Sequence, residues 1–361
     1  MQEQLNIALD KAEKLEMDTG SVTWKSPSNI ALIKYWGKHG MQLPANASIS
    51  FTLDQCHSET TLKWTPKLGS ERNIKFLFDG EEKPSFLPKI EAFFERISPY
   101  MGNLDAFDLE IHSSNSFPHS SGIASSASGM SALALCVADW ENRTLNTGEE
   151  EMMKKASFLS RLGSGSACRS LYKGLVSWGH HSELDDSSDE YGTEYSKAHP
   201  MFSNYKDAIL IVDKGVKHVS STIGHGLMNG HPFANARFET AKTNMSALLQ
   251  ALNKGDVQRF IEIVEAEALM LHAMMMTSSP YYLLLKPNTV NVIEEIWAYR
   301  KENGVPMAFT LDAGANVHLL YDGDYEEEIV NFIQNRLTPY CQNGLYICDN
   351  VGQGPVKIKE E

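Results

Sequence analysis

The segment NSFPHSSGIASSASGMSALALC, residues 115–136, combines seven serines with two glycines and has no acidic residue, lysine or arginine. We expect a helix to begin near Ala124, and the unpaired N–H groups of its first turn could bind a phosphate. Ser125 and Ser126 could add hydroxyl groups to the phosphate or to its metal ion. The pattern fits a serine-rich cap on a tightly packed helix equally well. A Walker A loop is excluded, because the sequence contains neither GxxxxGKS nor GxxxxGKT.

A second stretch of small residues, RLGSGSACRS, spans residues 161–170. We expect a helix at 164–173, with Arg169 one turn inside it, so that backbone amides and a guanidinium could hold a second anion. A Rossmann turn is excluded, because Cys168 stands where GxGxxG requires glycine. Taken alone, the stretch favours a glycine-rich hinge between helices. Two such stretches in one chain favour phosphorylated ligands.

Two lysines, Lys34 and Lys38, lie among apolar and aromatic residues in the segment SNIALIKYWGKHG. A lysine is costly to bury unless it meets an anion. The alternative is that each lysine extends from a strand edge to solvent, which is the commoner arrangement.

A single acid, Asp312, interrupts the apolar segment FTLDAGANVHLL at residues 309–320. It precedes a glycine-containing turn, so its ordinary role would be to form that turn. A carboxylate at the end of a strand could also act as a catalytic base.

Other candidate sites are weaker. The pair His180–His181 has no third histidine or cysteine at metal-ligand spacing, so no dedicated metal site is expected. The methionine-rich run 270–279 fits a packed helix. The GxSxG signature of many hydrolases is absent.

These residues must be positioned by strands and helices. We assign the strands from alternating apolar and polar residues and the helices from apolar residues three or four positions apart. We expect strands at residues 21–26, 47–54, 60–64, 73–80, 106–114, 207–215, 306–314, 316–322 and 344–350. We expect helices at residues 87–101, 149–161, 235–253, 255–276, 288–303 and 324–337, besides the two already described. The first twenty residues could form a short polar helix or a frayed tail. The acidic, polar segment 180–200 predicts a surface excursion at the boundary between two α+β halves.

The bulk composition narrows the function classes. The chain of 361 residues carries a net charge of −14, which disfavours binding to nucleic acid. Its five scattered cysteines, without a CxxC pair, favour reduced thiols over a disulfide framework. Residues 1–20 lack the apolar core of a signal peptide, and no apolar run has the roughly 20 residues that span a membrane. We therefore expect a cytoplasmic protein that does not bind membranes.

Five motifs, NIALIKYWGK, FPHSSGIASSASG, GSGSACRS, VSSTIG and LDAGAN, resemble signatures of the diphosphomevalonate decarboxylase family, within the GHMP kinase superfamily. They occur in the family's order, and the resemblance covers about residues 21–350. It implies an α+β fold of two GHMP-type domains, an ATP-binding domain at 1–200 and a second domain at 201–361, with the active site in the cleft between them. It also implies a homodimer.

The activity that the resemblance implies is decarboxylation of (R)-5-diphosphomevalonate to isopentenyl diphosphate, a step of the mevalonate pathway, with Mg²⁺ and with ATP as co-substrate. The implied catalytic residues are Asp312, Lys34 and Arg169. The implied substrate-binding residues are Asn29, Tyr35, Trp36, Gly37, Lys38, Ser164, Gly165, Ser166, Ala167, Cys168, Arg169, Ser221 and Thr222. The implied ATP-binding residues are Ser120, Ser121, Gly122, Ala124, Ser125 and Ser126, with Mg²⁺ carried by ATP and held by Ser125 or Ser126.

The motifs depart from the family pattern at several positions. His225 stands where a methionine is expected, Ala315 replaces a proline, and Glu81 replaces an arginine. Three alternatives therefore stay open: a 5-phosphomevalonate decarboxylase that yields isopentenyl phosphate, a mevalonate 3-kinase, and a non-catalytic phosphate sensor. The presence of both Lys34 and Asp312 argues against the kinase, and the Lys–Arg–Asp set argues against the sensor.

Overall fold

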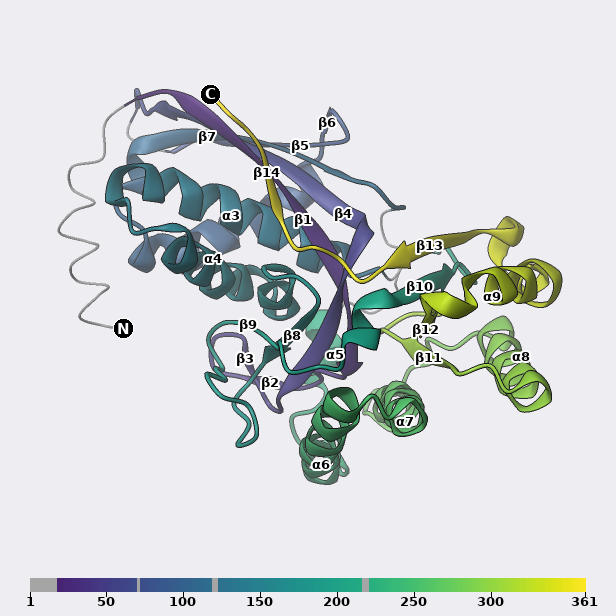
Figure 1. Cartoon of the computed structure of the whole chain (residues 1–361). Helices are drawn as coiled ribbons and strands as arrows, with labels where there is room; N and C mark the ends of the chain where they lie inside the picture. Colours follow the sequence, from purple (N-terminus) through teal and green to yellow (C-terminus); the bar gives the residue numbers. More distant parts are fainter. Residues whose placement is uncertain (1–17, 70–71, 119–122, 216–220) are drawn as a thin grey trace.

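The computed structural model describes residues 18–69, 72–118, 123–215 and 221–361. Figure 1 shows a mixed α+β architecture in which a large sheet with its helices lies beside a smaller sheet with helices of its own. The α+β fold class that the sequence predicts is confirmed. None of the helices in the described ranges is long and apolar enough to cross a membrane.

The larger sheet has eight strands in the order β14-β1-β4-β7-β5-β6, with β8 paired to β4 and β9 to β8. Its strands are β1 (Gly20–Ile33), β4 (Ser48–Pro66), β5 (Ile74–Phe78), β6 (Glu81–Glu82), β7 (Phe107–Asn115), β8 (Leu175–Trp178), β9 (Thr193–Glu194) and β14 (Val356–Glu360). Only the pair β5–β7 is parallel. A short separate hairpin, β2 (Lys38–His39) with β3 (Leu43–Pro44), follows β1.

Strand β4 is continuous where the sequence suggests two strands, at 47–54 and 60–64. Burial is unbroken over residues 48–53 and alternates from Cys56 to Trp64. The first part is therefore covered on both faces and the second on one face, and Asp54 and Gln55 mark that change. The prediction of two strands was wrong because two polar residues marked a change of environment, not a turn.

Helices α2 (Leu87–Ile97), α3 (Ser125–Leu145) and α4 (Glu149–Gly163) accompany the larger sheet. Helix α3 packs against β1, β4 and α4 and is buried on most of its sides, which explains its lack of charge over the first turns. Its start at Ser125, with Ala124 as the left-handed N-cap at φ 43°, confirms the predicted helix start.

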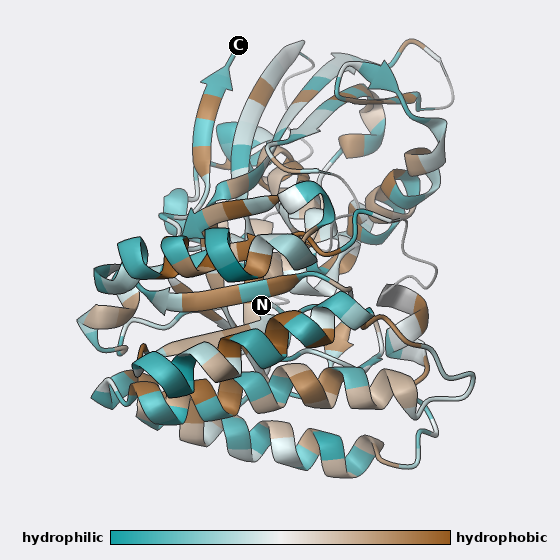
Figure 2. Ribbon diagram, turned by 90° about the vertical axis from the view of Figure 1, so that its right-hand side faces the viewer, coloured by the Kyte–Doolittle hydropathy of each residue, from teal (hydrophilic) through white to brown (hydrophobic). Residues whose placement is uncertain are grey.

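The smaller sheet has the order β11-β12-β10-β13, all antiparallel. Its strands are β10 (Tyr205–Leu210), β11 (Met307–Leu311), β12 (Val317–Asp322) and β13 (Tyr346–Asn350). The accompanying helices are α5 (Ser221–Gly226), α6 (Ala234–Lys254), α7 (Val257–Met276), α8 (Pro287–Asn303) and α9 (Glu326–Phe332). Helices in Figure 2 carry both hydrophilic and hydrophobic residues, as expected for helices with one buried face.

The two halves share a hydrophobic core. Ile33 and Phe51 of the larger sheet belong to the same buried cluster as Tyr205 of the smaller sheet and Phe260 of α7. Strand β14 also connects the two halves. It lies near the end of the sequence but pairs with β1 in the larger sheet. A division at residue 200 therefore leaves one strand of the second range in the sheet of the first.

Two expected elements differ in form. The helix expected at 164–173 is a 3-10 helix at Gly165–Ser170. The helix expected at 324–337 is a 3-10 turn, then α9, then a π-helix at Ile333–Leu337. Both segments were located correctly, but hydrophobic spacing does not separate 3-10 and π turns from α-helix.

The acidic segment 180–200 is anchored more firmly than its composition predicts. Its side chains are mostly exposed or half-buried, but β9 within it pairs with β8. Trp178 and Arg161 donate hydrogen bonds to the backbone oxygens of Asp189 and Glu190. The anchors come from the rest of the chain, so the composition of the segment could not show them.

Candidate active site

A polar pocket of about 510 Å³, including its open mouth, lies where the ends of β1 and β11 meet. It is lined by residues from both halves of the chain. They are Asn29, Ala31, Lys34, Tyr35, Trp36, Ala124, Ser166, Arg169, His225, Leu271, Asp312 and Ala313.

The two strand ends place Lys34 and Asp312 at this pocket. Lys34 directly follows β1, and Asp312 directly follows β11. Thr310 of β11 donates a hydrogen bond from its hydroxyl to the backbone oxygen of Ala31 in β1, at 3.4 Å, so the two strands meet at this point. His272 of α7 donates from Nε2 to the backbone oxygen of Asp312, at 3.1 Å. Residues remote in sequence are thus brought together by the fold.

The backbone of Lys34 is held by a buried ion pair from α6 and α7. Its N–H donates to Glu267 Oε2 at 2.9 Å, and its oxygen accepts from Arg237 Nη2 at 3.4 Å. Arg237 and Glu267 also bind each other, with Nη2 to Oε2 at 2.6 Å, and both side chains are almost fully buried. Asn46 donates a further hydrogen bond to the oxygen of Lys34, at 3.0 Å. We refer to Arg237 and Glu267 as the backbone clamp.

Breaking the backbone clamp should destabilise the fold. In Glu267→Gln the shape is kept but Arg237 is left as an uncompensated buried charge, which costs about 3–5 kcal/mol of unfolding free energy. The matched control is Glu262→Gln on the same helix, where the pair with Arg259 is half exposed and should contribute about 1 kcal/mol or less. Urea unfolding of the three proteins measures both effects. Equal stability of the two variants would contradict the clamp.

The ammonium group of Lys34 is buried, with 1% of the residue exposed. It donates to the backbone oxygen of Ala31 at 2.5 Å. Burial lowers the pKa of Lys34 to about 8. The nearby charge of Arg169 lowers this pKa further, whereas the carboxylates of Asp312 and Glu267 raise it. Lys34 is therefore a cation that loses its proton only a little above neutral pH.

This pKa predicts the alkaline limit of activity. Below pH about 8 Lys34 is mostly protonated, and above it the cation beside Asp312 is lost. Because kcat/KM reports the ionisation of the free enzyme, it should fall as pH rises through about 8. In Lys34→Arg the cation persists, so the remaining activity should lack this inflection. An inflection that survives in the variant would assign it to another group.

Arg169 is buried beside the pocket, with 2% of the residue exposed. Its guanidinium donates to the hydroxyls of Ser50 and Ser48, the latter at 2.6 Å, and lies 5.8 Å from the ring centre of Trp178. Within the described residues no carboxylate lies at ion-pairing distance from this guanidinium. Hydroxyls orient it but do not neutralise it.

The charges around the pocket leave a net positive site. Among the described residues that line it, the charged side chains are Lys34, Arg169 and Asp312. Two buried cations face one carboxylate, and a buried charge without a partner is costly. The pocket is therefore suited to an anionic ligand.

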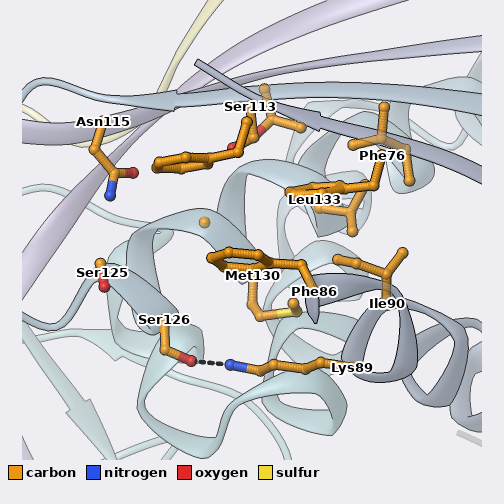
Figure 3. A pocket seen from close by; sticks show the side chains of 14 residues that line it. Phe76, Phe86, Lys89, Ile90, Ser113, Asn115, Ser125, Ser126, Met130 and Leu133 are labelled. Atoms are coloured by element: carbon orange, nitrogen blue, oxygen red, sulfur yellow. Dashed lines mark hydrogen bonds between the residues drawn. The ribbon is translucent and has the colours of Figure 1, made fainter. Parts of the chain in front are cut away.

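A second pocket, shown in Figure 3, lies against the first turns of α3. Its apolar wall includes Phe76 and Phe86, whose rings stack at 5.6 Å. Ser125 and Ser126 form its polar edge, and Lys89 of α2 donates a hydrogen bond to Ser126. Ala124 lines the first pocket, so the start of α3 joins an aromatic pocket to the cationic one.

The structure places the predicted site residues in four groups. Those that line the first pocket are Asn29, Lys34, Tyr35, Trp36, Ala124, Ser166, Arg169 and Asp312, and Ser125 and Ser126 line the second. Gly37, Lys38, Ser164, Gly165, Ala167 and Cys168 line neither. Ser120, Ser121 and Gly122 lie outside the described residues, and Ser221 and Thr222 begin α5 but their side chains are not described.

Several of the residues outside the pockets have a visible structural role. The side chains of Ala167 and Cys168 are buried in the core, and burial raises the pKa of Cys168 to about 12. Gly165 packs so closely that a Cβ atom would lie 2.9 Å from both Tyr35 and Trp178. Lys38 donates to Gln42 at 2.6 Å.

The sequence did not reveal Lys89, His272 or the backbone clamp. Lys89 is one lysine on an ordinary amphipathic helix. Arg237, Glu267 and His272 lie within long helical patterns, where a charged residue is expected on the solvent side. For Glu267 alone the sequence offered an indication, because Glu267 stands between Val264 and Leu271 at the spacing of the apolar, buried face of α7.

Two family models match most of the chain. Residues 26–189 match the model of the diphosphomevalonate decarboxylase-like N-terminal domain, and residues 208–360 match that of the mevalonate 5-diphosphate decarboxylase C-terminal domain. The diphosphomevalonate decarboxylase of Ganoderma lucidum is 30% identical over 339 residues, which cover 88% of this chain and 82% of that protein.

Solved structures are similar over nearly the whole chain. The mevalonate diphosphate decarboxylase of Staphylococcus aureus has a TM-score of 0.81 and 28% identity, covering 95% of this chain and 100% of that one. The structure of MDDEF in complex with MVAPP, AMPPCP and magnesium has a TM-score of 0.78 and 27% identity, with the same coverage. The chain belongs to the diphosphomevalonate decarboxylase family.

Proposed function

We propose that the chain catalyses the ATP-dependent decarboxylation of (R)-5-diphosphomevalonate to isopentenyl diphosphate, CO2, ADP and phosphate. The observation that carries this proposal is the meeting of Lys34, Arg169 and Asp312 at one pocket, beside the start of α3. The names of the relatives, and the MVAPP, AMPPCP and magnesium bound to one of them, support the same activity.

We propose that ATP occupies the pocket of Figure 3. The aromatic wall around Phe76 and Phe86 suits a base, and the hydroxyls of Ser125 and Ser126 with the ammonium group of Lys89 suit phosphates. Either serine hydroxyl could hold the Mg²⁺ that ATP carries, which would neutralise phosphate charge during transfer. The first turn of α3 would then direct the terminal phosphate toward the first pocket.

Asp312 would act on the 3-hydroxyl of the substrate as base or orienting group. The proton passes to the carboxylate while the hydroxyl oxygen bonds to the terminal phosphorus of ATP and ADP leaves. Lys34 would attract this carboxylate through its opposite charge, and the same attraction works against the lowering of the pKa of Lys34 by burial.

Arg169 would then orient the substrate carboxylate. The bond from C3 to the phosphate oxygen breaks with its electron pair, so positive charge develops at C3. The bond to the carboxylate supplies the electrons of the new double bond, and CO2 leaves. A guanidinium held by Ser48 and Ser50 fixes the carboxylate in the geometry that this elimination requires.

The decisive experiment is an incubation with Mg-ATP and, separately, mevalonate, its 5-phosphate and its 5-diphosphate. We expect equal amounts of ADP, phosphate and CO2, with the highest kcat/KM on the 5-diphosphate and no reaction without Mg²⁺. A preference for the 5-phosphate would show that 5-phosphomevalonate is the substrate and would leave the proposed reaction type unchanged. ADP without CO2 on every substrate would indicate a kinase, and no turnover on any would indicate a non-catalytic relative.

We also propose a cytoplasmic homodimer built from domains at 1–200 and 201–361. The family resemblance supports the dimer, and the two family models support the division because they leave residues 190–207 between them. Light scattering on the purified protein tests the dimer, and a monomer mass would contradict it.

A further inference from the structure

His225 of α5 is a buried polar side chain at the first pocket. It is 8% exposed and lines the pocket. Its ring lies 4.2 Å from that of Tyr35 and 4.7 Å from that of Trp36, measured between ring centres. Two aromatic rings from the segment after β1 therefore fix the plane of the imidazole.

A backbone hydrogen bond fixes its tautomer. The N–H of Gly37 donates to Nδ1 of His225 at 3.0 Å, so Nδ1 must be the unprotonated nitrogen. Burial lowers the pKa of His225 to about 3, with further lowering by Lys38 and Arg169 and an opposing effect of Asp312. The ring is therefore neutral and carries its single proton on Nε2.

Nε2 has no hydrogen-bond partner within the described part of the chain. His225 lines the pocket, and its Nε2 is not fully enclosed by protein atoms. Its surroundings are cationic, because Lys38 and Arg169 together lower the pKa of His225 by more than Asp312 raises it. An unpartnered N–H group at a cationic pocket calls for an anionic acceptor.

We propose that Nε2–H of His225 donates a hydrogen bond to a phosphate oxygen of the phosphorylated mevalonate and so determines affinity for that ligand. This inference rests on the proposed function. A neutral donor suits the position because it binds the anion without adding a third buried cation to Lys34 and Arg169. It also makes the substrate contact independent of pH over the working range of the enzyme.

The experiment compares His225→Met, which fills a similar volume without an N–H group, with His225→Gln, whose amide can still donate. We expect the KM for 5-diphosphomevalonate to rise about 10-fold or more in His225→Met, as for a lost hydrogen bond to a charged group. The KM for ATP and kcat should change by less than about 3-fold, and His225→Gln should restore most of the affinity. An unchanged KM in His225→Met, or equal losses in both variants, would overturn the inference.

A measurement on the unaltered protein keeps the test independent of folding. With ¹⁵N-labelled histidine, NMR should show Nδ1 unprotonated at pH 7 and a shift of Nε2 when 5-phosphomevalonate or 5-diphosphomevalonate is added. An Nε2 signal that does not respond to a ligand shown by calorimetry to bind would overturn the role of His225 alone. If calorimetry detected binding of neither ligand, both the proposed function and the role of His225 would be overturned.

Discussion

Asp312→Asn should lose nearly all turnover while it still binds ATP. The substitution keeps the shape at the end of β11 and the backbone contact with His272, but it removes the only carboxylate among the described residues that line the pocket. For a residue that acts as acid or base, kcat and kcat/KM should fall alike, by about 10²- to 10⁴-fold. The ATP affinity should persist, because Ser125, Ser126 and Lys89 belong to the other pocket.

The matched control for this variant is Asp322→Asn. Asp322 ends β12 and accepts a hydrogen bond from the backbone N–H of Asp324, so it has the ordinary turn-forming role of an acid at a strand end. Asparagine fills that role well, and kcat should stay within about 2-fold. Steady-state kinetics and calorimetric titration with ATP measure both variants. Near-normal turnover in Asp312→Asn would return Asp312 to the same turn-forming role.

Lys34→Met should resemble Asp312→Asn more weakly, and the double variant should be little worse than Asp312→Asn alone. Lys34 acts through the carboxylate in the proposed mechanism, so the two losses should not multiply. Two independent, multiplying losses would show that Lys34 and Asp312 do not act as a pair.

Arg169→Ala should lower kcat by about 10²-fold or more, beyond any rise in KM. A guanidinium that fixes the leaving carboxylate acts on the reacting geometry and not only on binding. Arg169→Lys keeps the charge but not the planar fork that Ser48 and Ser50 hold, so it should recover only part of the rate. A variant changed in KM alone would show that Arg169 only binds the substrate.

Arg161→Ala is the control for the loss of a buried arginine. Arg161 is also buried, but its guanidinium binds backbone oxygens of Met41 and Glu190. Its removal should lower the melting temperature with little effect on kcat. Equal losses of kcat in the two variants would indicate that both act through stability.

The order of the elements could be predicted, because each depends on local sequence. The periodicity of 255–276 places α7 almost to the residue, and the resemblance singles out Lys34, Arg169 and Asp312. The 3-10 form of Gly165–Ser170 could not be predicted from hydrophobic spacing, and neither could the close packing of Gly165 against Tyr35 and Trp178.

The residues that hold the pocket in place could not be predicted either, because their roles depend on tertiary contacts. Glu267 and Arg237 are ordinary helix residues until α6 and α7 bring them to the backbone of Lys34. Their importance comes from burial and from one another, neither of which a single sequence displays. The position of Nε2 of His225 depends in the same way on the backbone of Gly37.

The pairing of β14 with β1 has a consequence for the order of events during synthesis. Residues Val356–Glu360 cover one edge of β1 through a ladder that pairs Val22 with Glu360 and Lys25 with Val356. An uncovered strand edge can pair with other chains. On the ribosome the larger sheet is almost complete long before β14 emerges, so the β1 edge stays open while the whole second half is translated. We expect nascent chains to be most vulnerable to aggregation in that interval, and chaperone protection there would favour the yield of folded protein.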